Sequence, residues 1–352
     1  MNDNENIAKV LVGLLEKGTS CVLATLITMD GSGPRHSGSK MVIDSLGNSF
    51  GTVGGSLLEA TVIKESGAVI TSGCSRFMDF YLDGKDSNAR GMICGGKTQL
   101  FLDFIPATVE NQEFFKKWGE TVLSGRDFYF LTHLQGAGQD EGTAGHTILF
   151  KDKFCFSSCQ LTQPEVEGLK NEAKLTSNVS IFNINENQVI IDPIRKFKTL
   201  YCFGAGHVAV PTAHLAALVG FRVVVIDDRP EFACAARFPD ASQVRVITDF
   251  DRAMEGLELD SDSYVVIVTR GHRFDRVVLE QAIKTKAGYI GMISSRRKRE
   301  VIYSALIAQG VSQEVLAKVY SPIGIPIGGE TPEEIAVSIV AELIKTRVEQ
   351  QG

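Results

Sequence analysis

The sequence lacks the marks of several large classes of protein. Its longest apolar runs, such as residues 22–27, have the length of a β-strand, whereas a membrane-spanning helix needs about 20 apolar residues. The first residues, Met-Asn-Asp-Asn-Glu-Asn, contain neither the basic residue nor the apolar stretch that a secretory signal requires. We therefore expect a cytoplasmic protein that makes no use of a membrane.

Charge and cysteine spacing argue against two further classes. The formal net charge of the 352 residues is −6, and no basic block stands out except 296–299. A nucleic-acid-binding protein needs a broader basic surface, so we expect no nucleic-acid partner. The seven cysteines are odd in number and include no Cys-x-x-Cys pair, which argues against a disulfide framework and against a structural zinc site.

The length and the pattern of elements predict two domains. Residues 1–191 mix strand and helix patterns, as expected for an α+β domain, and residues 192–198 form the expected linker. From 199 to 352, short apolar strands alternate with helices, one of them expected at 230–238. This alternation predicts a Rossmann-like, doubly wound parallel sheet. The last helix is expected to begin at Thr331-Pro332-Glu333-Glu334, because Thr331 and Glu334 can form a capping box.

The C-terminal domain carries a dinucleotide-binding pattern directly after its first strand. Gly204 and Gly206 lie between that strand and a helix, with Ala209 at the third glycine position. Small residues let the backbone approach a phosphate, and the helix N-terminus offers free N–H donors. Asp227 ends the next strand, 23 residues after Gly204 (227 − 204), close to the spacing of a ribose-binding acid.

More polar residues follow the other strands at the carboxyl edge of the same sheet, where ligands of open parallel sheets bind. Two serines there open a helix, so hydroxyl, N–H and guanidinium groups can converge on an anion. The candidates for a nucleotide or phosphate site are Gly204, Gly206, His207, Asp227, Arg229, His272, Asp275, Ser294, Ser295 and Arg296.

The N-terminal domain contains three glycine-rich loops. The loop at 31–40 resembles an anion-binding nest, the turn at 54–55 leads into a helix, and the turn at 94–96 precedes a strand. A thiol in such a turn is accessible, and positive charge on Arg35 or Lys97 would favour its thiolate. The candidate binding residues are Ser32, Arg35, Gly54, Gly55, Glu59, Cys94, Gly95 and Gly96.

Taken together, these motifs resemble those of the XdhC/CoxI family of maturation factors for xanthine and carbon monoxide dehydrogenases. The resemblance covers nearly the whole chain except about 106–196. It rests on the segments 31–35, 54–59, 94–96, 203–209, 269–275, 291–298, 321–324 and 330–334.

The resemblance implies a chaperone, not an enzyme, that holds the molybdenum cofactor (molybdopterin) while it is sulfurated. It implies delivery to an apo-molybdoenzyme of the xanthine dehydrogenase class, a homodimer, and a sulfurtransferase as a further partner. The N-terminal candidates would bind the cofactor, and Cys94 would meet molybdenum or its sulfur, because this soft metal accepts thiolate. Many members have cysteine after the Gly-Gly turn, where this chain has Ser56, so a two-cysteine mechanism lacks its second thiol at that position.

Two other functions stay open on the residues alone. The C-terminal domain could serve an NAD(P)-dependent oxidoreductase, with Asp227 selecting NAD through a ribose hydroxyl. It could instead bind a nucleotide that controls release of the molybdenum cofactor. An oxidoreductase needs a proton-transfer group, and neither His207 nor His272 has an identifiable partner in the sequence.

Overall fold

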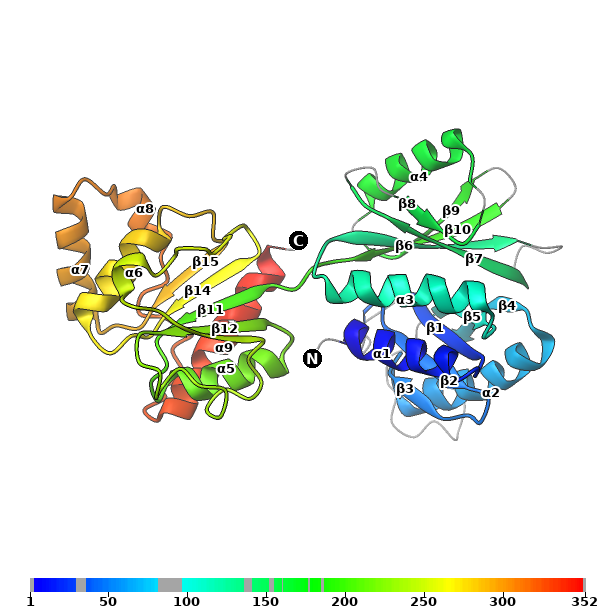
Figure 1. Cartoon of the computed structure of the whole chain (residues 1–352), viewed down its shortest axis with the longest axis horizontal. Helices are drawn as coiled ribbons and strands as arrows, with labels where there is room; N and C mark the ends of the chain where they lie inside the picture. Colours follow the sequence, from blue (N-terminus) through cyan, green and yellow to red (C-terminus); the bar gives the residue numbers. More distant parts are fainter. Residues whose placement is uncertain are drawn as a thin grey trace. The chain divides into compact units, whose positions relative to one another are not determined.

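The computed structural model describes residues 3–29, 36–81, 97–135, 141–151, 155–159, 161–176, 178–184 and 187–350. The chain divides into two compact units, Asn2–Lys196 and Phe197–Gly352 (Figure 1). Residues 192–194, expected to open a linker, instead complete strand β10 (Asn187–Ile194), which pairs with β6 (Phe128–Gln135). Across the described ranges, no helix is long and apolar enough to cross a membrane.

The N-terminal unit is built on a ten-stranded antiparallel sheet. Along its path the strands are β3 (Ser49–Gly51), β2 (Lys40–Asp44), β1 (Cys21–Met29), β5 (Lys97–Ile105), β4 (Ser75–Tyr81), β7 (Glu141–Leu149), β6, β10 and β9 (Ser180–Ile184), and β8 (Cys155–Ser157) pairs with β7. The two halves of this sheet are joined by a short ladder between β4 and β7.

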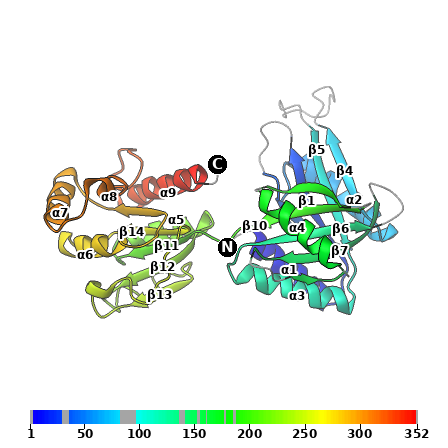
Figure 2. The ribbon, with the colours of Figure 1, turned by 90° about the horizontal axis from the view of Figure 1, so that it is seen from above.

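The sheet folds back on itself, because strands far apart along its path share hydrophobic clusters. Ile27 of β1 packs with Ile190 of β10, and Leu23 of β1 shares a second cluster with Phe130 of β6. The helices α1 (Asp3–Glu16) and α3 (Val109–Leu123) fill that second cluster between the two halves (Figure 1). The outer faces are covered by α2 (Ser56–Ser72) and α4 (Gln163–Leu175) (Figure 2).

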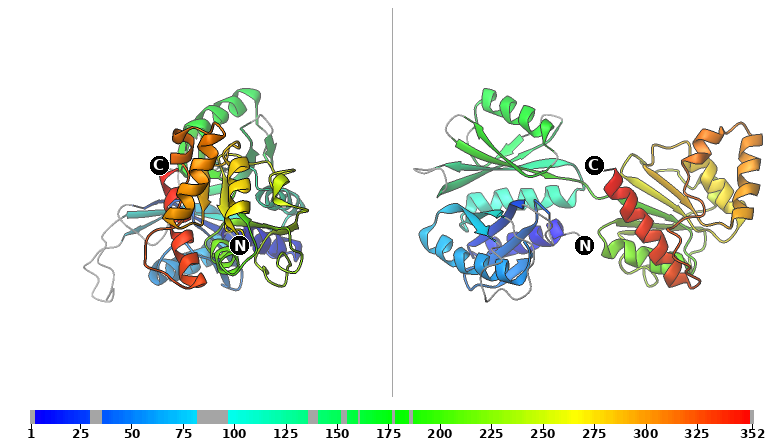
Figure 3. Two further views of the ribbon diagram at one scale, coloured as in Figure 1. Left: turned by 90° about the vertical axis from the view of Figure 1, so that its left-hand side faces the viewer. Right: turned by 180° about the vertical axis from the view of Figure 1, so that it is seen from behind.

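The C-terminal unit has the predicted doubly wound architecture. Its parallel sheet has the order β13 (Gln243–Val246), β12 (Arg222–Asp227), β11 (Thr199–Phe203), β14 (Ser263–Ile267) and β15 (Tyr289–Met292). The helices α5 (Ala209–Leu218) and α9 (Pro332–Glu349) cover one face (Figure 3). The opposite face is covered by α6 (His272–Ala282), α7 (Arg296–Ala308) and the short α8 (Gln313–Ala317).

Of two helices predicted from local sequence signals, one is present and one is not. The capping box at Thr331 and Glu334 is present, with Pro332 as the first residue of α9. The predicted helix at 230–238 is wrong, since this segment forms a series of turns between β12 and β13. Its Phe232 ring contacts two guanidinium groups, those of Arg229 at 3.8 Å and Arg237 at 4.7 Å from the ring centroid. These side-chain contacts outweigh a weak helical preference.

The packing of α9 predicts a strong dependence of stability on its inner face. Ile339 is 0% exposed in the cluster under α9, whereas Val337 on the same helix is 50% exposed. We expect Ile339→Ala to lower the free energy of unfolding by about 2–5 kcal/mol, because it leaves a cavity. The control Val337→Ala should change it by less than about 0.5 kcal/mol. Urea denaturation measures both, and equal effects would contradict the packing of α9.

Candidate functional site

Five strand ends of the N-terminal unit meet at one end of its sheet. Met29 of β1 pairs with Thr98 of β5, and Tyr81 of β4 pairs with Lys97 of β5. At the same end, β2 begins at Lys40 opposite Thr25, and β3 ends at Gly51. The antiparallel register therefore places the strand ends that flank the three glycine-rich loops at the same end of the sheet.

The Gly54-Gly55 turn connects this end of the sheet to helix α2. Gly55 is the N-cap residue in an extended conformation, and it provides no side-chain cap for the helix. The first N–H groups of α2 therefore need acceptors from elsewhere, as at an anion-binding helix N-terminus. Gly54 is restricted by packing, because an added Cβ would lie 2.9 Å from Cδ2 of Leu58.

Glu59, in the first turn of α2, is fixed by Thr52. The Thr52 hydroxyl donates a hydrogen bond to Oε1 of Glu59 and lies 3.4 Å from the carbonyl oxygen of Gly54. The backbone N–H of Thr52 in turn donates to the carbonyl oxygen of Lys40 at 3.1 Å. The half-buried Glu59 carboxylate thus has a defined position beside the uncapped helix N-terminus.

The remaining N-terminal candidates fall outside the described residues. These are Ser32, Arg35, Cys94, Gly95 and Gly96, and the side chain of Ser56 is likewise outside the description. Their predicted contacts with a cofactor stay predictions.

A buried ion pair that the sequence did not reveal lies next to this site. Nζ of Lys40 pairs with Oδ2 of Asp192 and donates to the carbonyl oxygen of Gly38 at 3.1 Å. Lys40 is 3% exposed and Asp192 is 4% exposed. The pair joins β2 to β10, two strands that are not neighbours in the sheet. The sequence pattern placed Lys40 in the glycine-rich loop at 31–40 and Asp192 in a linker, so no sequence signal brought the two residues together.

A second buried polar group has a structural role. Nε2 of His146 lies 2.8 Å from Oδ2 of Asp103, and the imidazole is surrounded by the rings of Phe114, Phe115 and Phe130. This pair lies between the two halves of the folded sheet. Among the described residues, no hydrogen bond or ion pair links it to the 36–40 segment or the 52–59 turn. We assign it to the core.

In the C-terminal unit, the two glycines of the predicted phosphate loop have different roles. Gly204 has φ +113°, and an added Cβ would lie 2.3 Å from the carbonyl oxygen of Val268. It is needed where β11 and β14 come together. An added Cβ at Gly206 would meet no atom within 4 Å, so the space beside Gly206 is open to a ligand.

Asp227 is occupied by internal contacts. Its oxygens accept hydrogen bonds from the N–H of Ala205 at 2.8 Å, from the N–H of Arg229 at 3.0 Å, and from the Arg229 side chain at 2.8 and 3.0 Å. Burial alone would raise the pKa of Asp227, but the hydrogen bonds from Arg229 and Ala205 outweigh it and hold the pKa below its ordinary value of 3.8. Asp227 therefore holds the glycine loop, a different role from the predicted binding of a ribose.

A neighbouring ion pair was also missed. The Arg270 guanidinium binds both carboxylate oxygens of Asp228, which joins the ends of β12 and β14. It also lies 4.5 Å from the centroid of the Phe274 ring. Arg270 follows β14 directly, so its place at the carboxyl edge of the sheet was readable from the sequence, but its partner was not.

The other C-terminal candidates divide into internal and exposed residues. Asp275 is fully buried, pairs with Lys298, and accepts from the Thr269 hydroxyl at 2.6 Å. Ser295 caps α7, and the Ser294 hydroxyl lies 2.7 Å from that of Ser321. The exposed candidates are His207, His272, Arg296 and Ser295 itself.

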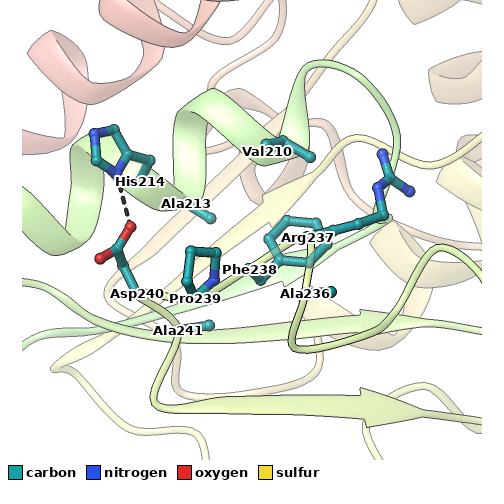
Figure 4. Close-up of a pocket in the computed structure, with 9 residues that line it drawn as sticks. All are labelled: Val210, Ala213, His214, Ala236, Arg237, Phe238, Pro239, Asp240 and Ala241. Carbon is teal, nitrogen blue, oxygen red and sulfur yellow. Dashed lines mark hydrogen bonds and ion pairs between the residues drawn. The ribbon is translucent and has the colours of Figure 1, made fainter.

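Two hollows adjoin along helix α5. One, of about 310 Å³, is lined by His207, Val210 and Arg237 and by the start of α9. The other, of about 300 Å³, shares Val210 and Arg237 and extends to His214, whose Nδ1 lies 2.7 Å from Oδ2 of Asp240 (Figure 4). Of the predicted site residues that the structure describes, only His207 lines either hollow. Within the described ranges, no three His, Cys, Asp or Glu side chains cluster to hold a metal ion.

The contacts of Asp227 predict a pH-dependent loss of stability. We expect Asp227→Ala to lower the free energy of unfolding at pH 7 by about 3–5 kcal/mol, because it removes the buried acceptor of the Ala205 N–H, the Arg229 N–H and the Arg229 side chain. Since the folded-state pKa of Asp227 is depressed, its contribution is present above its ordinary pKa and is lost as the pH falls through the folded value. The difference between variant and parent should therefore shrink near pH 3.

Urea denaturation at both pH values measures this effect. Asp240→Ala is the matched control, because that aspartate is 47% exposed in its pair with His214 and should cost at most about 1 kcal/mol. A difference for Asp227→Ala that stays constant with pH would contradict the assignment.

Comparison with known proteins agrees with this architecture. The model described as the XdhC Rossmann domain matches residues 200–343, and the model of the XdhC and CoxI family matches residues 14–81. A crystal structure described as a xanthine dehydrogenase from Bacillus halodurans superposes with a TM-score of 0.80 at 24% identity, covering 99% of this chain and 96% of that chain. It shows that the fold of this chain occurs in a solved structure.

Two curated relatives align over nearly their whole length. A protein of Bacillus subtilis (strain 168) described as a probable subunit of xanthine dehydrogenase is 26% identical over 344 residues, which is 97% of this chain and 98% of the relative. The molybdenum cofactor insertion chaperone PaoD of Escherichia coli (strain K12) is 22% identical over 357 residues, covering 99% and 91%. With residues 14–81 matched by one model of the family and residues 200–343 by the other, the chain belongs to the XdhC/CoxI family.

Proposed function

We propose that this protein is a maturation factor that binds the molybdenum cofactor and delivers it to an apo-molybdoenzyme of the xanthine dehydrogenase class. The observation that carries the proposal is the alignment of 99% of the chain with a relative named as a molybdenum cofactor insertion chaperone. Membership of the XdhC/CoxI family supports it independently over both units.

The described N-terminal residues fit such a ligand. The cofactor carries a phosphate and a pterin ring with N–H donors. The uncapped N-terminus of α2 at Gly54 and Gly55 offers N–H donors to an anion, and Glu59, held by Thr52, offers a carboxylate acceptor to the pterin. In the proposal, Ser32, Arg35, Gly95 and Gly96 complete the phosphate contacts. Cys94 supplies a thiolate ligand to the molybdenum centre.

The contacts of the C-terminal unit do not favour an NAD(P)-dependent oxidoreductase. Both oxygens of Asp227 already accept hydrogen bonds from Ala205 and Arg229, so a ribose would have to displace them. The open space at Gly206 fits a phosphate, and we assign this loop to the phosphate of a nucleotide or of the pterin cofactor itself. The proposed partners are the client molybdoenzyme, a sulfurtransferase that acts on the held cofactor, and a second copy of this chain in a cytoplasmic homodimer.

The proposal predicts stoichiometric binding of the cofactor. The purified protein should bind molybdenum cofactor released from a molybdoenzyme, and Glu59→Gln and Cys94→Ala should each weaken that binding by about tenfold. The loss has a physical reason: each substitution removes one acceptor or ligand from the site. Ultrafiltration with molybdenum and pterin analysis measures bound cofactor.

Glu65→Gln is the matched control for Glu59→Gln. Glu65 lies on the same helix, but its carboxylate pairs with Arg76 at 2.5 Å, so its loss should leave binding unchanged. A parent protein that binds no cofactor at stoichiometric concentration would refute the proposed function. Binding of NAD or NADH in a calorimetric titration would instead favour the oxidoreductase.

A further inference from the structure

We propose that Lys40 and Asp192 are positioning residues for the N-terminal cofactor site, an inference that rests on the function proposed above. The buried pair holds both arms of the site, the 36–39 segment and the 52–59 turn, against strand β10. Neither residue touches the ligand in this scheme. They act through the backbone groups that Lys40 fixes.

Lys40 contacts both arms directly. Its Nζ donates to the carbonyl oxygen of Gly38 at 3.1 Å, and its own carbonyl oxygen accepts from the N–H of Thr52 at 3.1 Å. Thr52 then positions Glu59 and contacts Gly54 through its hydroxyl. One residue thus connects the end of the first loop to the turn that opens α2.

The 36–39 segment is otherwise held by strand β1. The N–H of Gly38 donates to the carbonyl oxygen of Leu26 at 2.8 Å, and the N–H of Leu26 donates to the carbonyl oxygen of Ser39 at 2.9 Å. The Ser37 hydroxyl donates to the carbonyl oxygen of Ile27 at 2.5 Å. These bonds tie the segment to its own half of the sheet, whereas the contact of Lys40 with Asp192 ties it to the other half.

The cost of burying two charges supports a role beyond stability. Removing a lysine and an aspartate from water costs about as much as, or more than, their attraction returns. Well-packed apolar residues at the same positions would stabilise the fold equally well. Fixing a unique geometry is a documented reason for keeping such charges in some proteins, and in this proposal the geometry that the pair fixes is that of the candidate site.

The double variant Lys40→Met/Asp192→Val separates positioning from stability. It replaces both charges with apolar side chains, and valine suits a strand, so we expect a folded protein with a melting temperature close to that of the parent. Its affinity for molybdenum cofactor should fall by about tenfold or more, as when a residue that supports a ligand is lost. Hydrogen exchange at the amides of Gly38 and Thr52 should become faster.

The matched control is His146→Phe/Asp103→Val, which removes the other buried pair of the same unit. Its affinity for the cofactor should stay within about twofold of the parent value. The reason is that, among the described residues, no hydrogen bond or ion pair links this pair to the 36–40 segment or the 52–59 turn. Equal loss of affinity in the two double variants would overturn the positioning role, and so would parent-like affinity in a folded Lys40→Met/Asp192→Val protein.

If the double variant does not fold, the single variant Asp192→Asn tests the same proposal. This change keeps the shape of the side chain and leaves the Lys40 ammonium with neutral acceptors, so Lys40 is held less firmly. We expect weaker cofactor binding in the folded variant, and affinity equal to that of the parent would overturn the inference. Failure of the parent to bind cofactor is a separate result, which refutes the proposed function and not the structural link.

Discussion

The constraint on which both units depend is that a carboxylate taken out of water needs a charged or hydrogen-bonding partner. Asp192, Asp227 and Asp275 are each almost completely buried, and each meets a cation and lies at the end of a strand or beside a loop. Two of the three cations lie outside the strands, and the third, Lys40, begins β2 but pairs with an acid on a strand that is not its neighbour. Lys40 belongs to the N-terminal glycine-rich region, Arg229 follows β12, and Lys298 lies in the first turn of α7. The buried acids therefore set the positions of the loops on which binding is proposed to occur.

The loops also contain glycines, and the surroundings of these glycines differ from one position to the next. Gly204 is required because any side chain would collide with the carbonyl oxygen of Val268, whereas Gly206 has free space around the position of a Cβ. The two glycines read as one motif in the sequence, yet only Gly206 has the open surroundings expected beside a ligand. Gly54 is closer to the first case, because its neighbour Leu58 fills the space. A glycine pattern thus predicts a loop more reliably than it predicts which residue faces the ligand.

The sequence predicted the architecture of the C-terminal unit well, because β-branched strands alternating with capped helices leave few other folds. Helix α9 began where the capping box at Thr331 indicated. The helix predicted at 230–238 was wrong because the turns there are accompanied by contacts of the Phe232 ring with Arg229 and Arg237, and specific side-chain contacts of this kind leave no periodic signal. For the same reason the pairing of Lys40 with Asp192, which are 152 residues apart, was invisible. Asp227 was correctly placed at the end of its strand, but its hydrogen-bond partners were not predictable from spacing.

The internal use of Asp227 bears on what the C-terminal unit can recognise. In a dinucleotide-binding domain, the acid at the end of the second strand is free to accept hydrogen bonds from a ribose. Here its oxygens face the N–H of Ala205 and the side chain of Arg229, and the next residue, Asp228, is engaged by Arg270. A ligand in the open space beside Gly206 would therefore find no free ribose acceptor at Asp227. In the proposal, recognition at this loop depends on the phosphate of the ligand, which NAD shares with a phosphorylated pterin, and any preference between the two has to come from residues other than Asp227.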